Sequence, residues 1–284
     1  MNAILNLDKD FRPFGDKHLE IPIKLLKFSG GEIHVNLGMD SDALNDYEDI
    51  YITHRVNSSD NLMEVMLAKD ALRREFYGDI HLFIPYLPYA RQDRVCSPGD
   101  AFSARVFAEI INSAGFTSVA CLDAHSSVST ELIYNCFSIK NTSYVEEALD
   151  ELVGEGLVLV SPDAGAQKKS QQLFLETRFN ALVQCEKKRN PETGELSGFN
   201  VLAEDLNGHD CIIVDDICDG GGTFIGLAKE LKAKGAGDLY LFVTHGIFSK
   251  GTNELLHYYE HIFTTDSIQS PVDGMNVTQL KISI

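Results

Sequence analysis

The chain has 284 residues, of which 44% are hydrophobic and 23% charged, the composition of an ordinary globular protein with room for one or two domains. Its net charge of −18 argues against nucleic acid as a partner, because phosphate backbones are bound by broad basic surfaces. No apolar run approaches the length that spans a bilayer, and the first residues lack the pattern of a signal peptide, so we expect no membrane partner and a cytoplasmic location.

The first predicted elements are a hairpin, a strand and a long helix. Segments Ile21–Lys27 and Ile33–Leu37 have strand character and are joined by the turn Phe28-Ser-Gly-Gly-Glu32. A short strand follows at Ile50–Thr53, and a Ser-Ser-Asp cap then precedes an amphipathic segment over residues 61–74. The Met and Leu residues of that segment have the spacing of a buried helix face.

A cluster of cations follows the next predicted strand, which starts at His81 and stops at Pro85. The cluster is Arg91-Gln92-Asp93-Arg94. Open α/β sheets bind ligands at the carboxyl ends of their strands, so these residues are a candidate anion site. The same pattern is equally compatible with a solvated turn.

A unit of helix, glycine, strand and histidine occurs twice, 120 residues apart. In the first copy a helix over residues 102–112 precedes Gly115, a strand and His125, and in the second Gly235 and His245 flank a strand. Such a repeat predicts two similar α/β domains, which we place at residues 1–140 and 141–284. On position alone, His125 would more often be a structural residue than a ligand.

The second domain has a buried strand over residues 157–160, and Asp163 follows it. Further along, two strand-like segments flank a polar connection over residues 186–194. This connection carries three consecutive cations, Lys187, Lys188 and Arg189. Consecutive cations in a loop usually only increase the solubility of a protein. They would form a catalytic lid if phosphates bind nearby, because a mobile loop can bring positive charge onto a transferring group and exclude water.

The most informative stretch is Cys211–Phe224, where a buried strand runs into Asp215 and Asp216 and then into a glycine-rich turn and a helix. Backbone N–H groups of such a turn bind an anion at the positive end of the helix, and Thr223 adds a hydroxyl. Paired carboxylates accept hydrogen bonds from the vicinal hydroxyls of a sugar. The stretch lacks both the lysine of a nucleotide P-loop and the glycine spacing of a dinucleotide fold. It therefore predicts a sugar-phosphate site, with an ordinary acidic loop as the alternative.

Together these motifs resemble the phosphoribosyl pyrophosphate (PRPP) synthetase family. The glycine-rich stretch is similar to its Asp-Asp-x-x-Asp-Thr-Gly-Gly-Thr motif, which type I phosphoribosyltransferases share, with Gly220 in place of the first Thr. The hairpin turn is similar to its Phe-Ser-Asp-Gly-Glu, with Gly30 in place of Asp, and Tyr89-Ala-Arg-Gln-Asp-Arg94 matches a highly specific signature of the family. The resemblance runs from Phe28 to about Phe248.

This resemblance implies a fold and a reaction. The fold would be α/β, with two similar type I phosphoribosyltransferase-like domains, each a mostly parallel sheet flanked by helices. The protein would be a ribose-phosphate diphosphokinase, which transfers the β,γ-diphosphoryl group of ATP to the C1 hydroxyl of ribose 5-phosphate and yields PRPP and AMP. Its cofactor would be Mg²⁺, and it would form homo-oligomers built from dimers.

The resemblance also implies a role for each site residue. ATP would be bound by residues of the first domain, namely Phe28, Glu32, Arg91, Gln92 and Arg94. Ribose 5-phosphate would be bound by the glycine-rich stretch, namely Asp215, Asp216, Asp219, Gly220, Gly221, Gly222 and Thr223. The catalytic residues would be Lys187, Arg189 and His125, and the metal ligands would be His125 and Asp163.

Two alternatives remain open at this point. A nucleobase phosphoribosyltransferase shares the Asp-Asp loop but leaves the Arg91–Arg94 cluster and the duplicated first domain unexplained. A non-catalytic regulatory homologue should have lost the lid cations or His125, and this chain keeps both. The alternating segment Asn276–Ile284 resembles a final strand, so we expect a short form without the family's C-terminal closing segment and the regulatory site that this segment helps to build.

Overall fold

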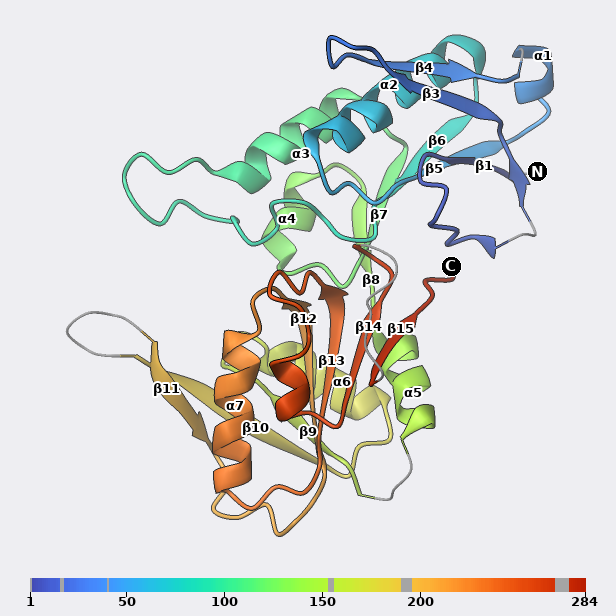
Figure 1. Cartoon of the computed structure of the whole chain (residues 1–284). Coiled ribbons are helices and arrows are strands. Elements are labelled where there is room, and N and C mark those ends of the chain that lie inside the picture. Colours follow the sequence, from blue (N-terminus) through green and yellow to red (C-terminus); the bar gives the residue numbers. More distant parts are fainter. Residues whose placement is uncertain (1, 16–17, 40, 153–155, 190–195, 269–275) are drawn as a thin grey trace. The chain divides into compact units, whose positions relative to one another are not determined.

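The computed structural model describes the chain except for residues 1, 16–17, 40, 153–155, 190–195 and 269–275, and except for the side chains of residues 41, 188–189 and 196–197. The chain, drawn as a ribbon in Figure 1, divides into two compact units. Each unit has its own cluster of buried apolar side chains. Unit 1 comprises Met1–Lys140, Ser267–Ser270 and Lys281–Ile284, and unit 2 comprises Asn141–Asp266 and Pro271–Leu280. None of the described helices has the length and apolar character needed to span a bilayer.

Unit 1 is built on a six-stranded parallel sheet. In spatial order its strands are β2 (Leu19–Glu20), β1 (Asn2–Asn6), β5 (Asp49–Thr53), β6 (Asp79–Phe83), β7 (Ser118–Leu122) and β8 (Cys136–Ile139). The helices of the unit are α1 (Ser41–Leu44), α2 (Ser59–Glu75), α3 (Ser103–Ser113) and α4 (Ser127–Leu132). The central strands are mostly apolar because the flanking helices exclude water from a parallel sheet.

Helix α2 begins at the predicted cap. The Ser58 hydroxyl accepts a hydrogen bond from the Asn61 N–H at 3.2 Å. Further along the helix, Val65 and Leu72 are buried. The predicted hairpin also forms, as the antiparallel strands β3 (Ile23–Lys27) and β4 (Ile33–Leu37), and β4 packs against α2.

Unit 2 is built on a seven-stranded sheet. In spatial order its strands are β11 (Leu196–Val201), β10 (Ala181–Arg189), β9 (Val158–Ser161), β12 (Cys211–Cys218), β13 (Leu239–Gly246), β14 (His261–Thr265) and β15 (Val277–Leu280). All neighbours are parallel except β10 and β11, which are antiparallel. The helices are α5 (Thr142–Glu151), α6 (Gln167–Glu176), α7 (Gly222–Ala233) and the 3₁₀ turn η2 (Leu255–His257).

The repeated unit of the sequence is a repeated unit of structure. In unit 1, α3 connects the parallel neighbours β6 and β7, and in unit 2, α7 connects the parallel neighbours β12 and β13. Gly115 and Gly235 follow the two helices with φ of +63° and +77°, the left-handed conformation that ends a helix with little strain only at glycine. The expected α/β architecture with two mainly parallel, helix-flanked sheets is therefore confirmed.

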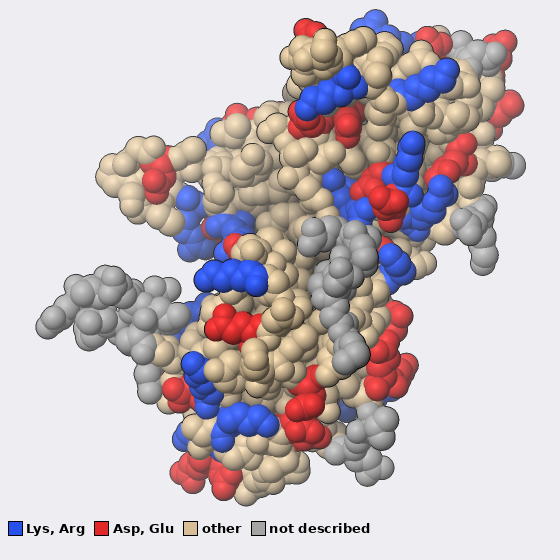
Figure 2. All heavy atoms as spheres, in the orientation of Figure 1, with Lys and Arg blue, Asp and Glu red and all other residues tan. Residues whose placement is uncertain are grey.

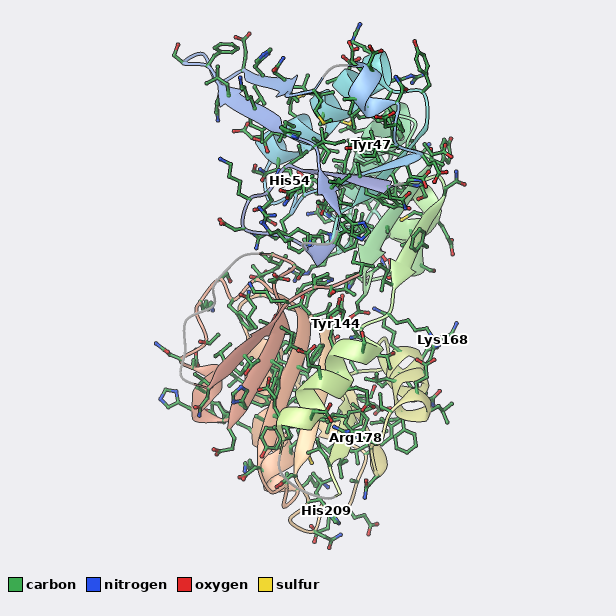
Figure 3. All side chains as sticks on the ribbon, turned by 90° about the vertical axis from the view of Figure 1, so that its right-hand side faces the viewer. Tyr47, His54, Tyr144, Lys168, Arg178 and His209 are labelled. Atoms are coloured by element: carbon green, nitrogen blue, oxygen red, sulfur yellow. The ribbon has the colours of Figure 1, made fainter. Side chains whose placement is uncertain are left out.

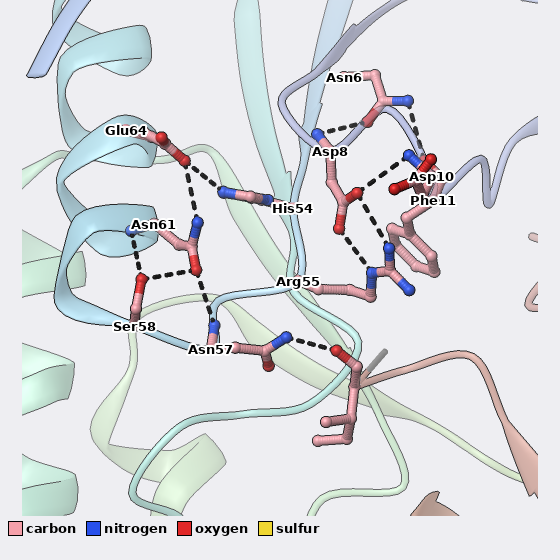
Figure 4. Close-up of polar contacts among 11 residues, drawn as sticks. Asn6, Asp8, Asp10, Phe11, His54, Arg55, Asn57, Ser58, Asn61 and Glu64 are labelled. Atoms are coloured by element: carbon pink, nitrogen blue, oxygen red, sulfur yellow. Dashed lines mark hydrogen bonds and ion pairs between the residues drawn. The ribbon is translucent and has the colours of Figure 1, made fainter. Parts of the chain in front are cut away.

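A group of polar contacts lies at the carboxyl ends of β1 and β5 in unit 1 (Figure 4). The Arg55 guanidinium donates two hydrogen bonds to Asp8, at 2.6 and 3.0 Å, and lies 5.3 Å from the Phe11 ring centroid. Nearby, the His54 ring contacts the Glu64 carboxylate of α2 at 2.7 Å. Burial opposes ionisation of Asp8, but the hydrogen bonds and the charge of Arg55 hold its pKa below the usual value.

The strand boundaries differ most from the sequence-based expectation at β12, β10 and β15. Strand β12 continues past Val214 through both aspartates, because β13 pairs with it as far as Gly246. Strand β10 continues to Arg189, because β11 pairs with it there, so the predicted polar connection begins later than expected. Strand β15 is shorter than the alternation over residues 276–284 suggested.

Candidate functional site

The glycine-rich loop of unit 2 connects β12 to α7. Gly221 has φ of +76° and stands at the N-cap of α7, and no side chain of the described residues caps this helix. The first N–H groups of the helix are therefore available to an anion, which the helix dipole also favours. Thr223, in the first turn, is half-buried.

Two acids precede this loop within β12. Asp216 is buried and Asp215 half-buried, and an Asp215 carboxylate oxygen accepts a hydrogen bond from the Asp216 N–H at 2.9 Å. Burial and the neighbouring Asp216 carboxylate raise the pKa of Asp215 well above its ordinary value, and Asp163 adds to the effect. Hydroxyl donors or a cation would stabilise the ionised form, so this environment suits a polyol or a metal-bound ligand.

Asp163 and Lys187 form an ion pair at the same edge of the sheet. Asp163 follows β9, which lies between β10 and β12, and Lys187 lies near the end of β10. The Lys187 Nζ is 2.6 Å from one Asp163 oxygen, and the other oxygen accepts the Ala166 N–H at 3.0 Å. Burial opposes ionisation, but these hydrogen bonds lower the pKa of Asp163. The structure thus pairs a predicted catalytic cation directly with a predicted metal ligand.

The remaining predicted lid residues are less fully described. Glu186–Arg189 are strand residues paired with β11 rather than parts of a loop, and the Arg189 side chain lies outside the described atoms. Residues 190–195 also lie outside the described part of the chain. Lys168, a cation of unit 2 that lies on α6 and outside the predicted lid, is exposed and extends outward from the unit in Figure 3.

The predicted ATP cations of unit 1 lie in the long segment between β6 and α3. Arg91, Gln92 and Arg94 are exposed, whereas Asp93 between them is buried. Two nitrogens of Arg94 donate to the Asp93 carboxylate, at 2.8 and 3.3 Å. The hydrogen bond from Arg94 lowers the pKa of Asp93, and the nearby charge of His125 acts in the same direction.

His125 is exposed in the turn between β7 and α4. The Asp123 N–H donates to the Ile139 carbonyl and the Ala124 N–H to the Ser138 hydroxyl, both at 2.8 Å, so β8 holds this turn in place. The arginine segment and the His125 turn are electrostatically coupled, since the charge of His125 helps to lower the pKa of Asp93. This coupling through Asp93 was not predicted from the sequence, although an acid between two arginines was a signal for it.

Phe28 and Glu32 lie at the tip of the β3–β4 hairpin, where both are exposed. The Phe28 N–H donates to the Glu32 carbonyl at 2.8 Å, and the Phe28 ring lies 6.0 Å from that of His34. These contacts are internal to the hairpin, and they leave one face of the Phe28 side chain open, since it is 50% exposed.

The carboxylates of the candidate site fit a hard cation that takes only one or two of its ligands from the protein. Among the described residues, no group of three or more His, Cys, Asp and Glu side chains converges as a metal cage. Mg²⁺ is commonly held by one or two carboxylates together with water and substrate phosphates, and Asp163 or Asp215 can supply such a carboxylate. Cations and acids are interspersed over the face drawn in Figure 2.

Comparisons with known proteins give the family. The N-terminal domain of ribose phosphate pyrophosphokinase matches residues 17–115, and the phosphoribosyl synthetase-associated domain matches residues 177–284. The ribose-phosphate pyrophosphokinase of Granulibacter bethesdensis is 34% identical over 252 residues, which cover 83% of this chain and 78% of that protein. That of Brucella melitensis is 30% identical over 284 residues, which cover 94% of this chain and 88% of that protein.

The fold agrees with a solved structure. Phosphoribosylpyrophosphate synthetase from Mycobacterium smegmatis superimposes with a TM-score of 0.82 at 22% identity, covering 99% of this chain and 94% of that one. Such a match over nearly the whole chain shows a shared two-sheet fold of the type I phosphoribosyltransferase kind. On fold and sequence together, the chain belongs to the ribose-phosphate pyrophosphokinase family.

Proposed function

We propose that the chain is a ribose-phosphate diphosphokinase, which forms PRPP and AMP from ATP and ribose 5-phosphate. The observation that carries this proposal is the uncapped start of α7 next to Asp215 and Asp216, in a unit that also places Lys187 at the same sheet edge. An anion cradle, a polyol clamp and a cation at one edge are what a sugar phosphate undergoing phosphoryl transfer requires.

In the proposed reaction the C1 hydroxyl oxygen of ribose 5-phosphate attacks the β-phosphorus of ATP in line. A bond forms between that oxygen and the β-phosphorus, the bridging bond between the α- and β-phosphates breaks, and AMP leaves while the hydroxyl proton is lost. Lys187 and Arg189 would offset the charge that builds on the transferring group.

The binding roles follow the chemistry of the two units. Backbone N–H groups at Gly220–Thr223 would bind the 5-phosphate, and the Asp215 and Asp216 carboxylates would accept hydrogen bonds from the ribose hydroxyls. Arg91, Gln92 and Arg94 would bind the phosphates and base of ATP, with Phe28 and Glu32 at its adenine. His125 would assist from its turn beside Asp93. Mg²⁺ would neutralise phosphate charge, with Asp163 and His125 as its proposed protein contacts.

The proposal includes a cytoplasmic homo-oligomer built from dimers. Exposed apolar side chains on and beside the edge strand β8 support association through unit 1, since Tyr134 is 72% and Phe137 52% exposed. Light scattering of the purified protein checks this part separately.

The reaction product distinguishes the candidate activities. Purified protein incubated with ATP, Mg²⁺ and ribose 5-phosphate should produce AMP and PRPP in equal amounts. ADP and phosphate without AMP would contradict the proposal. Turnover of PRPP with a nucleobase but not of ATP with ribose 5-phosphate would indicate a phosphoribosyltransferase. Substrate binding without any turnover would indicate a non-catalytic homologue.

A further inference from the structure

The turn that follows β13 is joined to the glycine-rich loop by main-chain hydrogen bonds. The Phe248 N–H donates to the Cys218 carbonyl and the Ser249 N–H to the Asp219 carbonyl, both at 3.1 Å. The backbone of the next residue, Lys250, is therefore held beside the loop by the fold itself.

The side chain of Lys250 crosses the loop at Gly220. A Cβ atom at Gly220 would lie 3.6 Å from Lys250 Cε and 3.7 Å from Cδ, which are ordinary contact distances. The ammonium group is one bond beyond Cε. Among the residues that the structure describes, none forms an ion pair or hydrogen bond with it.

An anion site at this loop needs such a cation. Asp215, Asp216 and Asp219 surround the loop in a chain of net charge −18, and all three would repel a phosphate dianion. The start of a helix offers roughly half a positive charge, and Gly220 offers no side-chain donor. A lysine that is free to move, with a compact charge, can supply the missing attraction.

We propose that Lys250 binds the 5-phosphate of ribose 5-phosphate and that Gly220 leaves room for its side chain over the loop, where a side chain larger than a Cβ would crowd the Lys250 stem. This assignment rests on the proposed function, because it takes the phosphate monoester of that substrate as the ligand. It makes Lys250 an affinity-determining residue rather than a catalytic one.

Replacing the charge tests the assignment. In Lys250→Met the stem is kept and the ammonium group is lost, so the Kd for ribose 5-phosphate, measured by calorimetry on the full chain, should rise about tenfold. Lys250→Arg should bind almost as wild type does, and the Kd for ATP should stay unchanged in both variants. Lys229→Met is the matched control, since it removes one exposed lysine of α7 away from the loop, and it should bind as wild type.

A second variant tests the role of Gly220. Gly220 has no positive φ, so the backbone tolerates Gly220→Val, whose Cβ would contact the Lys250 stem and whose two methyl groups would crowd it. It should weaken binding about as much as Lys250→Met. The double variant should be little worse than either single one, because both changes remove the same interaction. Losses that add in full would contradict the shared role.

The failures of the two proposals are distinguishable. If wild-type protein does not bind ribose 5-phosphate, the proposed function and this assignment are both wrong. If wild type binds it and Lys250→Met binds it with the same Kd, the assignment alone is wrong and the proposed function stands.

Discussion

The two units share one scaffold, and both contain acids that pair with a cation, but among the described residues only unit 2 has an aspartate whose pKa is raised. In unit 1, Asp8 and Asp93 each pair with an arginine, and in unit 2, Asp163 pairs with Lys187; the pKa values of all three acids are lowered. In unit 2, the pKa of Asp215 is raised, because burial and Asp216 act on it. A paired acid stabilises the folded protein. An acid whose surroundings disfavour its ionised form is instead stabilised by a ligand that donates hydrogen bonds or positive charge.

The two copies of the repeated unit also end differently. Strand β7 stops at Leu122, and Asp123 follows with φ of +41°, which places His125 in an exposed turn. Strand β13 continues to Gly246, so His245 is only 1% exposed. His125 and His245 therefore have equal spacing in the sequence but different environments, because the length of the preceding strand determines whether the histidine is exposed to solvent.

The largest expected effect concerns Lys187, the predicted catalytic cation of unit 2. Lys187→Ala should lower kcat by about 10² or more, as removal of a preorganised charge-stabilising donor does, with little change in the affinity for ribose 5-phosphate. Arg189→Ala should behave in the same way. Lys229→Ala is the control that removes a lysine elsewhere in the unit. Unchanged kcat in both variants would reduce Lys187 to a partner of Asp163 and Arg189 to a surface charge.

The next effect tests the paired acid of unit 1. Asp8→Asn removes the carboxylate that pairs with the buried Arg55 and should cost about 2 kcal/mol in the free energy of unfolding at pH 7. Because the folded-state pKa of Asp8 is lowered, its contribution is present above the unfolded pKa and is lost as pH falls through the folded one. The difference from wild type should therefore shrink in urea titrations below about pH 4. Asp10→Asn, which removes an exposed neighbouring charge, should show neither effect.

The fold was largely predictable because it depends on local patterns. Apolar runs, caps and the 120-residue repeat predicted the hairpin and the central strands of both sheets, whereas β1, β8 and β14 were not predicted. Strand lengths were less predictable, since β12 and β10 continue only where a neighbouring strand supplies hydrogen bonds. Contacts between segments distant in the sequence, such as Asp163 with Lys187, leave no local pattern at all.

A smaller effect concerns the hairpin of unit 1. Gly30 offers no carboxylate, and its nearest neighbouring side-chain atom is Glu32 Oε2, 3.7 Å from where a Cβ would lie. Gly30→Asp should add an acceptor for the adenine amino group and raise the preference for ATP over GTP about tenfold in kcat/KM. Ser29→Asp, which places the same charge one residue away, should not. If wild type already prefers ATP more than about a thousandfold, another residue reads the base.

The smallest expected effect returns to Asp215. Since its folded-state pKa is raised, its ionisation opposes folding, so the cost is absent below the unfolded pKa and grows as pH rises toward the folded one. Asp215→Asn should therefore stabilise the ligand-free protein by about 1 kcal/mol at pH 7, and the gain should vanish below about pH 4. Asp238→Asn, at an exposed position beside β13, removes one negative charge from the same unit and should leave stability unchanged. A ligand-free Asp215→Asn protein that is less stable than wild type would mean that Asp215, like Asp8, holds the fold together, and the contrast between the two units would be lost.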